Sequence, residues 1–69
     1  MKTSARNHFS GTVKDLVQGP VTTEVTITVA SGIDIVATIS TRSAHALGLA
    51  KGKRAHALVK ASNVIVAVD

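Results

Sequence analysis

Apolar and polar residues alternate most regularly in the stretch 21–29. The apolar or β-branched positions Val21, Thr23, Val25, Ile27 and Val29 are separated by Thr22, Glu24, Thr26 and Thr28. A period of two places one set of side chains on each face of a β-strand. The stretch therefore predicts a half-buried strand with one face turned toward a core.

Four further stretches predict strands. The alternation resumes at 33–39 after Ser31-Gly32, which indicates a β-hairpin. The less regular stretch 8–17 contains Gly11, which we interpret as a bulge or a site of close approach, and it ends at the turn Gln18-Gly19-Pro20. The stretches 54–60 and 64–68 predict a fourth and a fifth strand.

Only the stretch 39–49 reads as a helix. Hydroxyl residues open it, Ala44, Ala46 and Leu47 follow, and Gly48 stands where a left-handed cap belongs. Ser40 or Thr41 is expected to cap the first turn, and from this stretch alone capping is favoured over anion binding. The predicted fold is all-β: a single domain, residues 1–69, forming a five-stranded OB-like barrel with one short helix between strands 3 and 4.

Two of the predicted strands, 33–37 and 64–68, carry apolar residues on both faces. A single barrel has only one interior, so the outward row would be an exposed patch. We expect another copy of the protein to cover it, which would also support a chain of only 69 residues.

The composition points to an anionic partner in a reducing compartment. The formal net charge is +4, and cysteine is absent, which excludes disulfides and thiolate metal sites. No signal peptide or membrane span is visible, so the expected location is the cytoplasm and no membrane partner is expected.

Catalytic and metal-binding patterns are also missing. The four acids are not paired within a motif, and no nucleophile and base stand at a suggestive spacing, so we expect a protein that is not an enzyme. The three histidines have no ligand-type spacing in sequence and are interpreted as surface or interface residues. A single-stranded nucleic-acid module using Lys51, Lys53 and Arg54 is the alternative function, but Phe9 alone cannot form a stacking platform for bases.

A small oxyanion fits the donors better. Hydroxyl and cationic groups occur at three separated places: Ser4 with Arg6, the stretch 40–43, and Lys60 with Ser62. Arginine offers a planar fork of donors and lysine a compact charge. No acid lies close in sequence to any of the three groups, so a pocket formed from them would contain donors only.

The same positions carry a family resemblance. The segments Ser4-Ala5-Arg6-Asn7 with Gly11-Thr12-Val13, then 39–43 with Leu47-Gly48-Leu49, then 57–64 (ALVKASNV), resemble the molbindin or Mop family of small cytoplasmic molybdenum-pterin-binding proteins. The resemblance covers essentially the whole chain in the same order. It implies that the protein binds and stores molybdate, or tungstate, as a homohexamer built as a trimer of dimers.

The resemblance also implies which residues hold the anion. One subunit would supply Ser4, Arg6, Lys60 and the backbone of Ala61 and Ser62, and a neighbour would supply Ser40 and Ser43. A second kind of site on the threefold axis would lie near Gly19 and Val21. The older family name suggests a third function, a carrier of a pterin cofactor, but the sequence offers neither an aromatic platform nor a nearby acid for a pterin ring.

Overall fold

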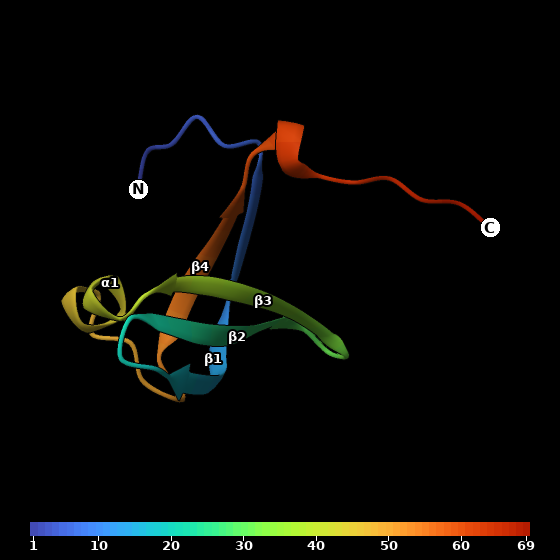
Figure 1. Cartoon of the computed structure of the whole chain (residues 1–69). Helices are drawn as coiled ribbons and strands as arrows, with labels where there is room; N and C mark the ends of the chain where they lie inside the picture. Colours follow the sequence, from blue (N-terminus) through green and yellow to red (C-terminus); the bar gives the residue numbers. More distant parts are fainter.

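The computed structural model describes residues 1–69 as one curled antiparallel sheet with a short helix (Figure 1). The strands are β1 (Asn7–Gln18), β2 (Thr22–Ala30), β3 (Ile33–Ser40) and β4 (Arg54–Val59), and the helices are α1 (Thr41–Ala46) and the single 3-10 turn η1 (Ala61–Asn63). The sheet order is β3-β2-β1-β4. The long central strand β1 pairs with β4 through its first half and with β2 through its second half. The predicted all-β, OB-like class is therefore confirmed, although the sheet forms half a barrel.

The fifth predicted strand is wrong for the single chain. Residues 64–68 form no ladder with any strand, and they extend away from the sheet (Figure 1). Their apolar side chains lie in solvent, with 92% of Ile65 and 85% of Val66 exposed. The prediction recognised the strand-forming residues, but a strand also needs a partner edge, and this chain does not bring one of its own edges to the segment.

The backbones of β1 and β2 come very close together at Gly11. A Cβ on Gly11 would overlap the carbonyl oxygen of Thr28, so this glycine is a site of close approach, as one of the two predicted alternatives stated. The register shifts lie elsewhere, between Val13 and Asp15 and between Thr28 and Ala30. Such irregularities increase strand twist and bend, which lets a narrow sheet wrap around its core.

The core is small and aliphatic. Its buried members come from three strands: Val13 of β1, Val25 and Ile27 of β2, and Ala57 of β4. Of the predicted inward positions, Thr23, Val25 and Ile27 are buried and Val29 is partly buried, but Val21 precedes β2 and is 73% exposed. Beside this core lies an open apolar hollow of about 510 Å³, and 13 of its 16 lining residues are hydrophobic.

Helix α1 is fixed at both ends as the sequence predicted. Ser40 caps it, because its Oγ accepts a hydrogen bond from the Ser43 amide at 3.0 Å. Gly48 follows the helix with φ of 63°, the left-handed conformation that a glycine adopts without strain. The side chain of Lys53 then donates to the carbonyls of Leu47 and Gly48, both at 3.0 Å. A helix of six residues is thereby held by its caps and by contacts with β2 and β3.

Candidate functional site

The N-terminal arm and the turn that follows β4 come together where β1 begins and β4 ends. Asn7 is paired with Val59 in the antiparallel ladder, and its side-chain amide donates to the Val59 carbonyl at 3.2 Å. Arg6 precedes one member of this pair and Lys60 follows the other. Antiparallel pairing thus brings the N-terminal arm and the 3-10 turn η1 to the same end of the sheet (Figure 1).

Hydrogen bonds shape the backbone on both sides of this meeting point. In the arm, the Ala5 amide donates to the Thr3 hydroxyl at 3.1 Å, which bends the chain locally. In η1, the hydrogen bonds are donated by Asn63 to Lys60 and by Val64 to Ala61. The first amides of such a turn have no partner within it, so the N–H groups of Ala61 and Ser62 remain free to donate to another group.

Between the arm and η1 lies a hollow of about 450 Å³, here called the terminal hollow, which is lined by Thr3, Ser4, Ala5, Arg6, Lys60, Ala61 and Ser62. Five of the predicted site residues are therefore brought together within one chain. Thr3 and Ala5 were not predicted, and their place beside Ser4 and Arg6 in the arm was the only signal for them. The lining contains two cations and no carboxylate, so the terminal hollow favours an anion.

The two predicted serines of the helix lie elsewhere. Ser40 and Ser43 lie at the start of α1, which is separated from the arm and η1 by the length of the β1–β4 ladder (Figure 1), and neither lines the terminal hollow. The Ser40 hydroxyl donates to Ser43 Oγ at 2.8 Å while accepting from the Ser43 amide. Both side chains are exposed. A single chain therefore does not unite the two halves of the predicted site.

The second predicted location, near Gly19 and Val21, is joined to the start of α1. The Gly19 amide donates to the Thr22 carbonyl at 2.9 Å, and the Gly19 carbonyl accepts from the Thr41 hydroxyl at 2.7 Å. The Val21 carbonyl accepts from the Thr41 amide at 2.8 Å, while 73% of the Val21 residue surface is exposed. These bonds fix the turn against the helix, and they leave Gly19 without a spare N–H donor.

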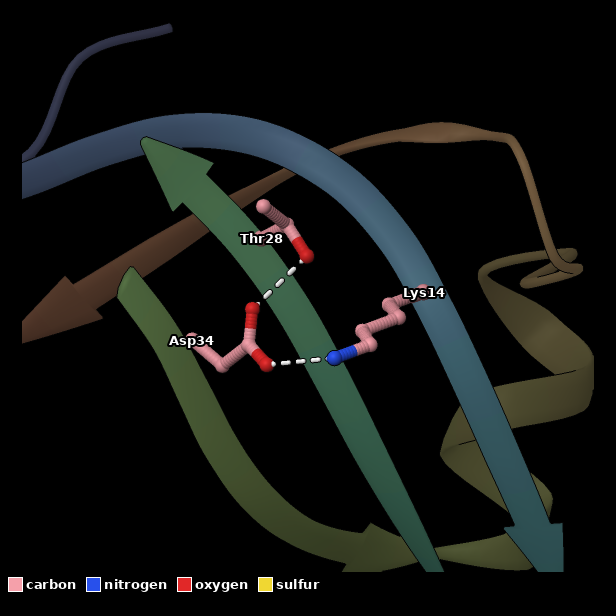
Figure 2. A network of polar contacts seen from close by, with 3 residues as sticks. All are labelled: Lys14, Thr28 and Asp34. Carbon is pink, nitrogen blue, oxygen red and sulfur yellow. Dashed lines mark hydrogen bonds and ion pairs between the residues drawn. The ribbon is translucent and has the colours of Figure 1, made fainter. Parts of the chain in front are cut away.

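One ion pair links β1 to β3 across β2 on the outer face of the sheet (Figure 2). Asp34 accepts from Lys14 Nζ at 2.9 Å and from the Thr28 hydroxyl at 2.8 Å. The hydrogen bond and charge of Asp34 raise the pKa of Lys14, and the hydrogen bonds from Lys14 and Thr28 lower the pKa of Asp34. This network links β1, β2 and β3, and its role is structural.

In the basic turn formed by Lys51, Lys53 and Arg54, the alternative nucleic-acid contact, one of the three cations is already hydrogen-bonded within the chain. Lys53 donates to the last carbonyls of α1, so its charge is turned toward the helix C-terminus, where a cation is favourable. Only one aromatic residue, Phe9, is present in the chain. The turn therefore lacks both a free cluster of cations and a stacking surface, which a single-stranded nucleic-acid site requires.

Comparison with known proteins decides the family. The TOBE domain family matches residues 3–66, which include every strand and the whole terminal hollow. The chain belongs to this family. This TOBE domain is 38% identical over 69 residues to a probable molybdenum-pterin-binding protein of Haemophilus influenzae, and the match covers all of both chains. The resemblance to the Mop proteins is therefore confirmed.

Longer relatives contain the same domain. The molybdenum transport protein ModE of Herbaspirillum seropedicae is 49% identical over all 69 residues of this TOBE domain, which spans only 26% of that protein. The chain thus corresponds to about a quarter of the length of the ModE relatives, and to the full length of the small Mop relatives.

Solved structures share the fold. A molybdate-binding protein from Sporomusa ovata superposes with a TM-score of 0.91 at 37% identity, covering 99% of this TOBE domain and 100% of that chain. The cytoplasmic molybdate-binding protein ModG, in a form with molybdate bound, superposes with a TM-score of 0.83 at 48% identity, covering 88% of this domain and 43% of ModG. Within the domain, no helix has the length and apolar character needed to cross a bilayer.

Proposed function

We propose that this chain binds molybdate, or tungstate, in the terminal hollow and buffers the oxyanion in the cytoplasm without catalysing a reaction on it. One observation carries the proposal: the hollow is lined by two cations, hydroxyl groups and free amides, and by no acceptor carboxylate. The relatives named for molybdenum and the molybdate-bound ModG structure support the same ligand class.

The donor-only lining suits the protonation state of molybdate. At neutral pH molybdate is a tetrahedral dianion that accepts hydrogen bonds and donates none, whereas phosphate retains a proton through much of this range. A phosphate proton would face other donors, and an unmet buried polar group costs about 1–3 kcal/mol. Sulfate also lacks a proton, so its rejection would rest on the size of the closed site.

The site is proposed to be completed by a neighbouring copy. Ser4, Arg6, Lys60, Ala61 and Ser62 come from one subunit, and Ser40 and Ser43 from another, in a homohexamer arranged as a trimer of dimers. The open form of the terminal hollow supports this arrangement, because every residue on its lining except Ala5 is exposed in the single chain. A dianion held there alone would keep much of its contact with water.

Unpaired apolar surface supports association with a second copy. The chain exposes the apolar segment 64–68 and has an open apolar hollow of about 510 Å³. Its sheet also has two edge strands, β3 and β4, whose outer sides are not paired within the chain. An extended segment from one copy would cover the hollow and an edge of the next. Each aliphatic side chain so buried contributes about 1.5–3 kcal/mol.

A second oxyanion location near Gly19 and Val21 remains part of the proposal. Because the Gly19 amide is already bonded to Thr22, the Val21 amide would be the donor, with equivalent amides from other copies around the threefold axis. This location would bind less tightly than the terminal hollow, because it contains no cation of its own.

Calorimetric titration of the assembled protein tests the ligand. Molybdate and tungstate are expected to bind with a saturable exothermic heat, and phosphate and sulfate at least tenfold more weakly. Equal weak heats for all four anions would remove the proposal. Retention of a pterin cofactor instead of the oxyanion would replace it with the cofactor-carrier function.

Mixed assemblies test whether two copies share the site. Arg6→Ala chains have an impaired hollow and an intact helix start, and Ser43→Ala chains have the reverse. If both are unfolded together and refolded, about a quarter of the sites in random mixtures combine the two intact halves. Molybdate capacity is expected to rise above that of either variant alone, and no rise would contradict sharing.

A further inference from the structure

Two histidines distant in sequence lie in direct contact on the outer face of the sheet. Nε2 of His8 and Nδ1 of His56 are 2.9 Å apart, and the two rings are tilted by 50° with centroids at 4.9 Å. The Ser10 hydroxyl is 3.0 Å from the same Nδ1 of His56. Nδ1 of His56 thus lies within 3.0 Å of both a second ring nitrogen and a hydroxyl oxygen, at an exposed place.

The strand register explains this convergence. Ser10 is paired directly with His56 across β1 and β4, while His8 is paired with Leu58. His8 and His56 are therefore diagonal neighbours on one face of an antiparallel ladder, at a separation that long side chains can bridge. Spacing along the sequence did not reveal the pair, because the ligand-type motif is formed across two strands.

Two groups compete for one nitrogen of this cluster. In a neutral imidazole, Nδ1 has either one proton or one lone pair, so it forms one strong hydrogen bond. Nδ1 of His56 has two partners within 3.0 Å, His8 and Ser10. A cation between the three atoms would accept a lone pair from each of them at once.

The separation of the two nitrogens also matches a metal chelate. Two imidazole nitrogens bound at about 2.0 Å with a right angle between them stand about 2.8 Å apart. Tetragonal sites with nitrogen and oxygen ligands are typical of Cu²⁺ and Ni²⁺, and Cu²⁺ binds most strongly in the divalent series.

We propose that His8 and His56, with Ser10 as a weaker third ligand, form a chelating site for a divalent transition-metal ion of the Cu²⁺ class. Each ring binds as the neutral imidazole, with its proton on the other ring nitrogen, so the ion takes the place of the hydrogen bond between the rings. The site shares no residue with the terminal hollow, and it fastens β1 to β4 on the side of the ladder that leads to that hollow.

Titration of the full chain with Cu²⁺ tests the proposal. Calorimetry is expected to show one Cu²⁺ per chain, and electron paramagnetic resonance to show two coordinating nitrogens. His8→Asn and His56→Asn should each weaken binding at least tenfold, and Ser10→Ala should weaken it less. His45→Asn is the matched control, because His45 is an exposed histidine on α1, outside the pair.

Three results would overturn the site. The first is Cu²⁺ binding that is unchanged in the double variant with both His8→Asn and His56→Asn. The second is an equal loss in the His45→Asn control. The third is a resonance spectrum of the unmodified chain with no more than one nitrogen ligand, and this measurement does not depend on any variant folding correctly.

Discussion

The side-chain amide of Asn7 donates to the carbonyl of Val59 at 3.2 Å, across a sequence separation of 52 residues. This bond lies immediately beside Arg6 on one strand and Lys60 on the other. It fixes the end of the β1–β4 ladder, from which the arm and η1 enclose the terminal hollow. The two cations of the hollow thus owe their proximity to backbone pairing, and no acidic partner holds them.

Removal of either cation is expected to weaken anion binding. Arg6→Ala and Lys60→Ala each remove a charge-assisted hydrogen bond, which is worth about 1.5–3 kcal/mol in a site closed from water. Calorimetry should therefore show at least about a tenfold weaker affinity for molybdate. Lys51→Ala removes the same charge from a turn outside the hollow and is the control. Wild-type affinity in both variants would show that the anion binds elsewhere.

A charge in the C-terminal segment is expected to disrupt assembly. Ile65→Asp places a carboxylate where an aliphatic side chain is proposed to be buried against a second copy, and burial of an unpaired charge is strongly unfavourable. Light scattering should show a smaller particle mass than for the wild type. Ile65→Val retains the apolar character and should retain the mass. An unchanged mass for the aspartate variant would exclude this segment from the interface.

Loss of the Thr41 hydroxyl is expected to destabilise the fold. Thr41 Oγ1 lies 2.8 Å from Thr23 Oγ1 and donates to the Gly19 carbonyl, and both threonines are buried. Thr41→Val leaves these groups without a partner, so the free energy of unfolding should fall by about 1–3 kcal/mol. Urea denaturation measures the change. Thr38→Val, on an exposed position of β3, should have little effect.

The Asp34 network predicts a pH dependence of stability. Because folding lowers the pKa of Asp34, its contribution is present above the ordinary carboxyl range and is lost as the pH falls through the lowered folded pKa. The raised pKa of Lys14 acts oppositely: its contribution is present below the ordinary lysine range and is lost as the pH rises through the raised value. Urea midpoints measured from acid to neutral pH should therefore converge for the wild type and Asp34→Asn in acid, and differ at neutral pH. If the urea midpoints of the wild type and Asp34→Asn differed by the same amount at every pH, the result would contradict the network.

Local signals in the sequence predicted the four observed strands, the hairpin and the helix caps. The alternation at 21–29 identified the buried face of β2, and Ser40 and Gly48 marked the two ends of the region around α1, because caps and alternation depend on residues that are close along the chain. The chemical character of the site was also predictable, since donors without nearby acids occur at Ser4, Arg6 and Lys60.

Contacts across the sheet were decided only by tertiary structure. The β1–β4 register joined the arm to η1 and paired His8 with His56, and neither contact has a signal in residue spacing. The segment 64–68 has a strand-like sequence but no strand partner in its own chain, because hydrogen bonding of an edge depends on what lies beside it. The sequence by itself determined which residues suit strands, caps and anions. The fold decided which of them meet, because register and curvature bring together residues from opposite ends of the chain.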